Sequence, residues 1–366
     1  MRLSLGGVAR NMAEAAHYVA GGAPVHHIAP LANDGIATFI KNETRRRGMT
    51  VENFFLPVGN VTSKPSSSDN VATTPSSPVA TLTLDANTND LITGVVNMDL
   101  VEIGLHAEEV ATRLAAFATQ RNAVGFDANL PVESMIELIE QRSGIVSTGC
   151  NAKGSGAAGH LTLLMHEPTS VAKSSRIIDA IASIANRNTH YPTTSAQKPL
   201  VDVVTPNTLE LKAMFARGKN LGLVSNDTLP PSSRTGQDEQ IRGVAELAIP
   251  LLPFFGAIMV TLGPRGVLCV YSKNESVAAS EPQLLLVPPY EALPADRILS
   301  TTGAGDSFAG ALLAELARQG SQSDSERHTT QQARLRTAIQ VGNRAAWRSL
   351  QSLDAVPQWG SIAGDL

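Results

Sequence analysis

The 366-residue sequence is poor in aromatic residues, in cysteine and in long apolar runs, and each shortage excludes a class of protein. Phe, Trp and Tyr make up 4% of the chain, against 29 Gly and 21 Pro, which favours a small-residue α/β architecture with tight turns over an aromatic-rich β-sandwich. The two cysteines, Cys150 and Cys269, are too few for a disulfide framework or a cysteine-rich zinc site. They suit a reducing compartment.

Strong charge and membrane-directing features are also lacking. A formal net charge of -4 offers no basic surface for a nucleic-acid backbone. No apolar run approaches the ~18 residues of a membrane span, and the opening MRLSLGGVARN has no signal-peptide hydrophobic region. We therefore expect a cytoplasmic globular protein that binds neither nucleic acid nor membranes.

Apolar periodicity predicts alternating strands and helices over most of the chain. Strands are expected at 25–28, 51–56, 123–127, 145–147, 161–165, 201–204, 257–262, 267–271 and 284–287. Helices are expected at 8–19, 35–47, 107–119, 132–141, 170–185, 207–216, 240–250, 304–318 and 330–350. This alternation predicts a mostly parallel central sheet with helices on both faces.

Residues 51–100 depart from that alternation. The short β patterns 79–84 and 91–96 predict a hairpin. Residues 62–78 hold 12 Ser, Thr or Pro in 17 positions, which predicts a flexible surface insertion. We expect a small β appendage here, beside an α/β core formed by 1–50 and 101–366.

The strongest chemical signal is Gly303-Ala304-Gly305-Asp306, directly before an apolar helix. Small residues allow a turn whose amides converge at the helix N-terminus, which is a site for an anion. A carboxylate beside an anion site repels phosphate, so Asp306 is interpreted as the base that deprotonates an attacking hydroxyl. The alternative is an ordinary N-cap aspartate after a glycine turn.

Three weaker signals accompany it. Asn207 and Glu210 follow a predicted strand and either form a capping box or hold hydrated Mg²⁺ near phosphates. Thr261, Gly263 and Gly266 join two strands, with glycines that serve a ligand or only a tight turn. Gly7 and Asn11 start the first helix, where the amide could reach a ligand hydroxyl.

One apparent motif is discounted. Residues 154–159 read GSGAAG, the dinucleotide-binding pattern, but a strand pattern follows them at once instead of the helix that such a site needs. A P-loop sequence and clustered metal-binding histidines are also absent from the sequence.

Taken in order, the four signals resemble the PfkB-type, ribokinase-like family of carbohydrate kinases. The family patterns G-G-x-x-x-N, N-x-x-E, T-x-G-x-x-G and G-A-G-D match in sequence from Gly6 to Asp306. The stretches SLGGVARNMAEAA, VGFDANLPVESM, HEPTSVAKS and VTPNTLEL resemble its pseudouridine kinase branch. In fungi that kinase is often fused to a pseudouridine-5'-phosphate glycosidase, which implies a functional link to such an enzyme.

The resemblance implies a three-layer α/β/α fold with a small β lid at 51–100, and transfer of the ATP γ-phosphate to the 5'-hydroxyl of pseudouridine. The implied alternatives are an adenosine or ribose kinase, or a catalytically weak kinase-like protein. The implied roles are catalysis by Asp306 with the amides of Gly303, Ala304 and Gly305, Mg²⁺ organised by Asn207 and Glu210, ATP bound by Thr261, Gly263, Gly266 and Asn343, and the sugar bound by Gly7 and Asn11.

Two departures from the family pattern qualify these expectations. The family's first strand, which carries an Asp that grips the sugar, has no counterpart before Gly6, and we expect it to be missing. Ser300 stands where many members have an Asp tied to monovalent-cation activation, so the resemblance implies no potassium requirement. Because family lids often pair subunits, a homodimer formed through the lid is expected.

Overall fold

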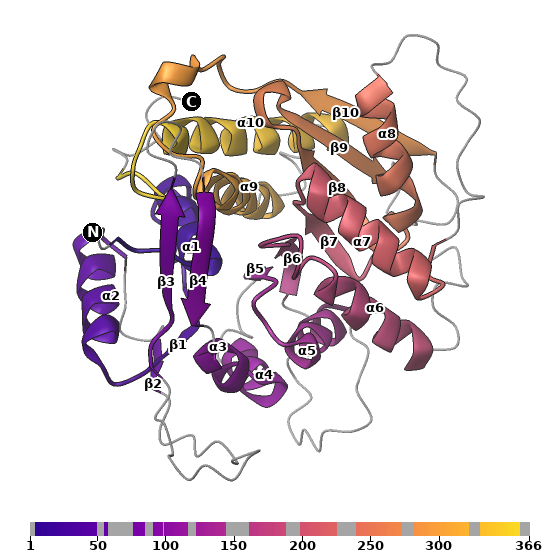
Figure 1. Ribbon diagram of the computed structural model, residues 1–366. Coiled ribbons are helices and arrows are strands. Elements are labelled where there is room, and N and C mark those ends of the chain that lie inside the picture. Colours follow the sequence, from indigo (N-terminus) through magenta and orange to yellow (C-terminus); the bar gives the residue numbers. More distant parts are fainter. Residues whose placement is uncertain are drawn as a thin grey trace.

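The computed structural model describes residues 4–49, 55–57, 76–84, 91–97, 99–115, 122–143, 161–187, 198–224, 239–272, 281–321 and 330–358. A six-stranded sheet forms the centre of this part of the chain, with helices on either side (Figure 1). The expected strand at 145–147 and the discounted glycine motif at 154–159 lie outside the described residues.

The central sheet is mostly parallel. Its strands, in spatial order, are β10 (Pro282–Val287), β9 (Val267–Ser272), β8 (Phe255–Thr261), β7 (Val201–Val204), β6 (Leu161–Glu167) and β5 (Asn122–Asp127). β5 to β8 run parallel to one another, whereas β9 pairs antiparallel with both β8 and β10. The carboxyl ends of the four parallel strands therefore lie along one edge of the sheet.

Both faces of the sheet are buried. Along β8, Ile258 and Val260 belong to the apolar core on one face, while Ala257 and Met259 belong to the core on the other. Successive side chains of a strand point to opposite faces, so continuous apolar strands require cover on both sides. The expected three-layer arrangement is confirmed.

Two helix layers supply that cover (Figure 1). The helices packed on one face are α4 (Ala107–Ala115), α5 (Val132–Ser143), α6 (Arg176–Arg187), α7 (Thr208–Asn220) and α8 (Glu239–Ala248). Those on the other are α1 (Val8–Val19), α9 (Ala304–Gly320) and α10 (Gln331–Leu350). No described helix is both long and apolar enough to cross a membrane.

Two small sheets lie apart from the central one. β1 (Ala29–Leu31) pairs parallel with β2 (Phe55–Pro57), and β3 (Val79–Leu84) pairs antiparallel with β4 (Leu91–Asn97). Residues 62–75 of the expected insertion lie outside the described part of the chain.

Ser77, at the end of the expected insertion, is fully buried. Its amide donates to Asp34 Oδ2 (2.7 Å), and its Oγ accepts from the amide of Ala32 (3.0 Å). The prediction of a free surface segment is therefore wrong at Ser77, because pairing with the N-cap of α2 (Gly35–Arg46) holds it.

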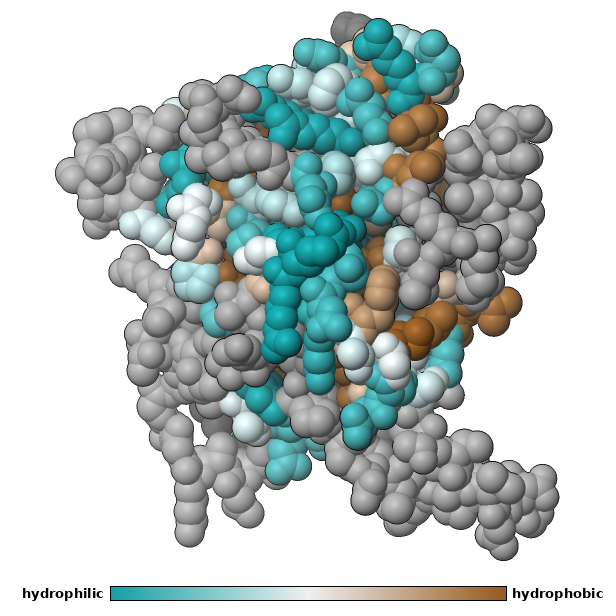
Figure 2. Space-filling view, turned by 90° about the vertical axis from the view of Figure 1, so that its left-hand side faces the viewer, coloured by the Kyte–Doolittle hydropathy of each residue, from teal (hydrophilic) through white to brown (hydrophobic). Residues whose placement is uncertain are grey.

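α2 has only one side against the rest of the protein. Figure 2 looks at the left-hand side of Figure 1, where α2 lies, and shows hydrophilic residues in the middle of that face. The exposed side chains of α2 include those of Asn42, Arg45 and Arg46, whereas Ala37 and Thr44 are buried. Such a stripe is typical of a helix on the surface of a globular domain.

Three elements differ from the sequence-based expectations. The first strand lies at Ala29–Leu31 and not at 25–28, because its partner β2 sets where pairing occurs. An unexpected short helix, α3 (Asp99–Gly104), precedes α4. α6 begins at Arg176 and not at residue 170, because residues 171–175 form turns and not a regular helix.

α1 and α9 pack unusually closely. A Cβ placed on Gly310 of α9 would lie 2.1 Å from the carbonyl oxygen of Met12 in α1. Only a glycine permits this approach. It brings the first turns of two helices that are some 300 residues apart in sequence to the same place.

We expect Gly310→Ala to lower the free energy of unfolding by about 1–3 kcal/mol, because the added methyl group must push α1 away from α9. Gly243→Ala in α8 is the matched control, since nothing lies within 4 Å of its Cβ position. There, better helix propensity should stabilise by ~0.5–1 kcal/mol. Urea unfolding of both variants measures the difference, and equal midpoints would contradict the packing argument.

Candidate active site

Polar and acidic residues gather at the carboxyl edge of the parallel strands. Asp127 ends β5, Glu167 ends β6 and Thr261 ends β8, while Asn207 follows β7 and caps α7. The N-termini of α1 and α9 reach the same edge. Ligands of open α/β sheets bind outside the carboxyl ends of the strands, so this is the expected position for a site.

The turn before α9 leaves the helix N-terminus without a side-chain cap. Gly303 is the N-cap residue, in left-handed conformation with φ 85°. A Cβ there would lie 2.4 Å from the carbonyl oxygen of Ala355, whereas nothing lies within 4 Å of a Cβ on Gly305. The turn is therefore closed behind Gly303 and open at Gly305, where the helix dipole favours an anion.

Asp306 is not the N-cap of α9, so the alternative of a simple capping aspartate is wrong. It lies in the first helical turn, and its Oδ2 accepts a hydrogen bond from Asn11 Nδ2 at 2.7 Å. Asn11 is one turn into α1, and its backbone N–H donates to the carbonyl of Gly7 (2.8 Å). The structure thus brings Gly7, Asn11 and Asp306 together.

The Asp306 carboxyl group has an elevated proton affinity. Burial, together with the charges of Asp127 and Glu210, raises its pKa to about 6, although the hydrogen bond from Asn11 and the charge of Arg10 oppose the rise. A carboxylate with a pKa near neutral is ionised at pH 7 and still basic enough to take a proton from a hydroxyl group.

Asp127 ties the start of α1 to the sheet. Its Oδ2 accepts from the amide of Ala9 (3.1 Å), and Asn129 donates to both of its oxygens, from its amide nitrogen and from Nδ2 (each 2.9 Å). The ammonium group of Lys173 donates to Asn129 Oδ1 (2.6 Å). Asp127, at the end of strand β5, therefore acts as an N-terminal capping group for helix α1.

Glu167 is the most strongly perturbed carboxyl group near the site. Burial raises its pKa well above the usual range, and repulsion from Asp306, Glu210 and Asp127 adds to the effect. Its Oε2 accepts from the amide of Thr169 (2.7 Å). Thr169 has a positive φ of 66°, which is rare for a residue with a branched Cβ and shows that the surrounding structure holds its backbone in place.

Asn207 and Glu210 form the capping box that was one of their two interpretations. Asn207 Oδ1 accepts from the amides of Leu209 (2.9 Å) and Glu210 (3.0 Å), and Glu210 Oε2 accepts from the Asn207 amide (2.9 Å). Burial raises the pKa of Glu210. The capping box uses only Oε2 of Glu210, so the other carboxylate oxygen, Oε1, takes no part in the cap.

The carboxylates at this edge are suited to a hydrated divalent cation and not to a fully protein-ligated one. In the described part of the chain, no three His, Cys, Asp or Glu side chains are arranged to hold a metal ion directly. Four carboxylates nevertheless lie near this edge, and the charges of Asp127 and Glu210 raise the pKa of both Glu167 and Asp306. Mg²⁺ binds proteins through one or two carboxylates and keeps water and phosphate ligands, so the donor set fits a hydrated ion that is completed by substrate.

The four residues assigned to ATP fall into two groups. The amide of Thr261 donates to the carbonyl of Pro206 (2.9 Å), which places it beside Asn207, and the Cβ position of Gly263 is open. Gly266 and Asn343 instead meet the end of β10. A Cβ on Gly266 would lie 2.1 Å from the carbonyl oxygen of Val287, and Asn343 Nδ2 donates to the carbonyl of Pro288 (2.7 Å).

Sequence reasoning missed Asp127, Glu167 and Arg10 as parts of the site. The first two had a usable signal, because each is an acidic residue at the end of an apolar strand pattern, VGFD and LMHE. Arg10 had no such signal, because an arginine within a predicted helix is common and only the tertiary structure shows its partners.

Solved structures share this fold over nearly the whole chain. Adenosine kinase from Sinorhizobium meliloti is 16% identical, with a TM-score of 0.57 over 98% of this chain and 81% of that one. Ribokinase from Arabidopsis thaliana, solved with ribose and ATP, is 14% identical, with a TM-score of 0.59 over 97% and 84%. Adenosine kinase from Anopheles gambiae is 14% identical, with a TM-score of 0.61 over 95% and 80%. At these identities, the likeness concerns the fold.

Sequence comparison decides the family. No curated protein sequence matches the chain, but the model of the pfkB family carbohydrate kinases matches residues 169–358. The chain belongs to this family. It is therefore a kinase that transfers a phosphoryl group to a hydroxyl group of a sugar or nucleoside. The ribokinase-like fold expected from the motifs is confirmed.

The matched region contains Asn207, Thr261, Asp306 and Asn343, but not Gly7 or Asn11. In this PfkB kinase, the contact between Asn11 and Asp306 joins the N-terminal motif to the matched region. The structure therefore connects the parts of the motif set that the family match leaves separate.

We expect Asp306→Asn to raise the melting temperature more at pH 8 than at pH 5. The folded protein holds a proton on Asp306 up to about pH 6, whereas the unfolded chain releases it near pH 4. Wild-type stability therefore falls as the pH rises through this window, and the variant escapes that loss.

Thermal unfolding of both proteins at the two pH values measures this effect. Asp296→Asn, at an exposed aspartate, is the control and should show no such dependence. A melting-temperature difference between Asp306→Asn and wild type that is equal at both pH values would contradict the assignment.

Proposed function

We propose that this PfkB kinase transfers the γ-phosphate of ATP to the 5'-hydroxyl of a ribosyl substrate, and that the substrate is pseudouridine. The observation that carries the phosphoryl-transfer proposal is the pairing of an uncapped helix N-terminus with a half-buried aspartate, Asp306, in its first turn. An anion site and a base thus lie on the same helical turn.

The proposed reaction uses this pairing directly. The acceptor hydroxyl gives its proton to Asp306 as its oxygen bonds to the γ-phosphorus, and the bond from that phosphorus to the bridging oxygen of ADP breaks. The amides of Gly303, Ala304 and Gly305 stabilise the negative charge on the transferring group. Catalysis then rests on positioning and charge stabilisation, without a covalent enzyme intermediate.

Glu210 and Glu167 are the residues proposed to face a hydrated Mg²⁺ on the phosphates, with Asn207 fixing the start of α7. The ion would neutralise phosphate charge beside carboxylates that otherwise repel it. The raised pKa of Glu167 supports this role, since burial and the neighbouring carboxylates both disfavour its charged form and a cation would offset them.

Substrate identity rests on the resemblance of four sequence stretches to the pseudouridine kinase branch. A second candidate, adenosine or ribose, is favoured by the names of the solved structures that share the fold. Gly7 and Asn11 are proposed to meet the sugar hydroxyls in either case, because they lie beside Asp306.

The proposal extends to residues 51–100 as a lid. The separate β3–β4 sheet supports it, and Val95 and Val96 are 76% and 51% exposed there. Closure of a lid would exclude water that would otherwise hydrolyse ATP. Pairing of two lids in a homodimer, a cytoplasmic location and a functional link to a pseudouridine-5'-phosphate glycosidase remain predictions.

We expect Asp306→Asn to keep ATP binding while lowering kcat by roughly 10²–10⁴-fold, because it removes the general base but not the anion site. Nucleotide binding by calorimetry and ADP release by a coupled assay measure the two effects. Asp296→Asn is again the control. Near wild-type turnover in Asp306→Asn would overturn the assignment of the base.

The substrate is tested by ADP release with ATP and Mg²⁺ against pseudouridine, uridine, adenosine and ribose. We expect the highest kcat/KM for pseudouridine. A preference for adenosine or ribose would replace the substrate while leaving the kinase proposal intact. No turnover with any of the four would favour the alternative of a catalytically weak kinase-like protein.

A further inference from the structure

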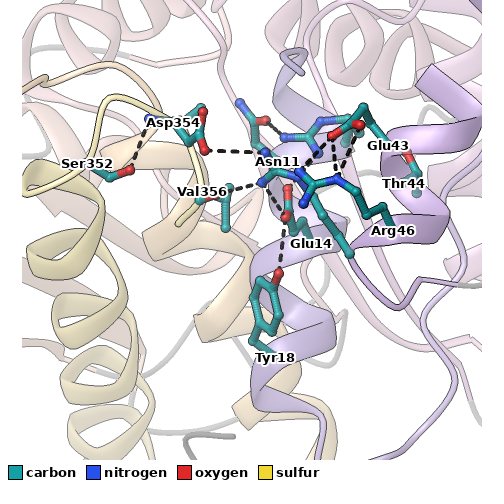
Figure 3. Close-up of polar contacts among 12 residues, drawn as sticks. Asn11, Glu14, Tyr18, Glu43, Thr44, Arg46, Ser352, Asp354 and Val356 are labelled. Carbon is teal, nitrogen blue, oxygen red and sulfur yellow. Dashed lines mark hydrogen bonds and ion pairs between the residues drawn. The ribbon is translucent and has the colours of Figure 1, made fainter. Parts of the chain in front are cut away.

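A buried network of charged side chains lies directly behind the proposed base. At its centre Glu14 of α1 is fully buried and accepts from three groups: Arg10 Nη1 (2.6 Å), Arg47 Nη1 (2.8 Å) and the Tyr18 hydroxyl (3.3 Å). Figure 3 shows Glu14 between Tyr18 below it and the segment of Asp354 and Val356 beside it. Such a network is not explained by stability, because the cost of desolvating a buried ion pair largely offsets the attraction between its charges.

Arg10 connects this network to the base through one amide. Arg10 Nη2 donates to Asn11 Oδ1, and Asn11 Nδ2 donates to Asp306 Oδ2 (2.7 Å). A guanidinium group only donates hydrogen bonds, and a carboxylate only accepts them. The Asn11 amide therefore has one orientation that satisfies both neighbours, and Arg10 is the group that excludes the flipped one.

Arg10 is itself held in place on several sides. Its Nε donates to the carbonyl of Gly6 (3.2 Å), Glu14 takes its Nη1, and its side chain is only 4% exposed. An arginine with this many fixed contacts cannot leave Asn11 without breaking a buried ion pair. Its position is thus as rigid as that of the helix that carries it.

The same network reaches the glycine turn of α9. Arg47 donates to the carbonyl of Val356 (3.0 Å) and lies 3.5 Å from Asp354. Between them, Ala355 closes the turn at Gly303, and its carbonyl accepts from Ser307 Oγ (3.2 Å). The contacts around Glu14 therefore support both Asp306 and the glycine turn at Gly303.

We propose that Arg10, held by Glu14, is a positioning residue for Asp306 that acts through the side-chain amide of Asn11. The inference rests on the proposed function, because it takes Asp306 as the base. It adds a residue, and a reason for the buried Glu14–Arg47 pair, that neither the motifs nor the fold assign.

Arg10 also affects the ionisation of the base. The charged groups that face Asp306 are Arg10 from α1, Asp127 from β5, Glu167 from β6 and Glu210 from α7. Arg10 is the cation of this set and opposes the rise that burial and the carboxylates cause in the pKa of Asp306. Loss of its charge should therefore move the acid limb of the kcat profile to higher pH.

The test uses the full chain and the double variant Arg10→Met/Glu14→Gln. Replacing both partners leaves no buried carboxylate without its cation. The amide oxygen of the introduced glutamine can still accept from Arg47, which also keeps Asp354 and the carbonyl of Val356, so the protein should fold. Arg46→Met is the matched control, since Arg46 is 59% exposed and pairs with Glu43 at the surface. Melting temperature, kcat, KM for ATP and the pH profile of kcat are measured for each.

We expect the double variant to lose roughly ten- to hundredfold in kcat at pH 8, because a misplaced base costs rate even when it is ionised. KM for ATP should stay within about twofold, and the acid limb should shift to higher pH. Arg46→Met should match wild type. A folded double variant with wild-type kcat and an unshifted acid limb would overturn the proposal.

A mutant cycle tests the route through Asn11. If Arg10 acts through this amide, adding the double substitution to Asn11→Ala should cause no further loss of kcat at pH 8, beyond about twofold. A purely structural role would lower kcat by the same factor in both backgrounds, and that result would overturn the proposed route.

A measurement without turnover separates this inference from the proposed function. The Asp306 carboxyl carbon, labelled with ¹³C and assigned by its absence in Asp306→Asn, is titrated by NMR. Its pKa should be higher in Arg10→Met/Glu14→Gln than in wild type, even if none of the four substrates reacts. An unchanged pKa would overturn the inference, whereas a wild type without activity would overturn the proposed function alone.

Discussion

The hydrogen bond between Asn11 and Asp306 is the contact on which the rest of the site depends. It links positions 295 residues apart, and it exists because α1 and α9 approach until their backbones touch at Met12 and Gly310. That approach places two helix N-termini together at the carboxyl edge of the sheet. This approach sets the orientation of Asp306 and the position of the glycine turn, and it places Gly7 and Asn11 at the site.

Electrostatics at this edge oppose stability. Burial raises the pKa of Asp127, Glu167, Glu210 and Asp306, and repulsion from neighbouring carboxylates adds to the rise at Glu167 and Asp306. A protein selected only for stability would not gather four carboxylates in one place, because each loses hydration and gains repulsion. Such an arrangement is favourable where a substrate or a cation supplies positive charge, and it is common at sites that move protons.

The glycines of the motifs serve different physical purposes. Gly303 is required by its left-handed conformation and by the backbone of Ala355, and Gly266 by the carbonyl of Val287. Gly263 is required by its own left-handed φ of 60°, whereas Gly305 has an open Cβ position and no positive φ, so packing does not explain it. A motif of small residues thus combines positions that shape the fold with positions that leave room for a ligand.

The sequence by itself determined the alternation of strands and helices, the α/β class and the four motifs, because local periodicity and turn chemistry are written in neighbouring residues. The strand at Val201–Val204 and the cap at Asn207 were predicted from such local patterns. Local patterns also misplaced the first strand, where a distant partner decides the outcome, and the start of α6, where turns at 171–175 precede the helix.

Only the tertiary structure decided which residues meet. The hydrogen bond between Asn11 and Asp306 joins segments from opposite ends of the chain, and the contact of Asn343 with Pro288 joins segments 55 residues apart. No local rule ranks Arg10 above Arg46, although one is buried behind the base and the other pairs at the surface. Burial and partner choice depend on how the helices pack, and packing is a property of the whole fold.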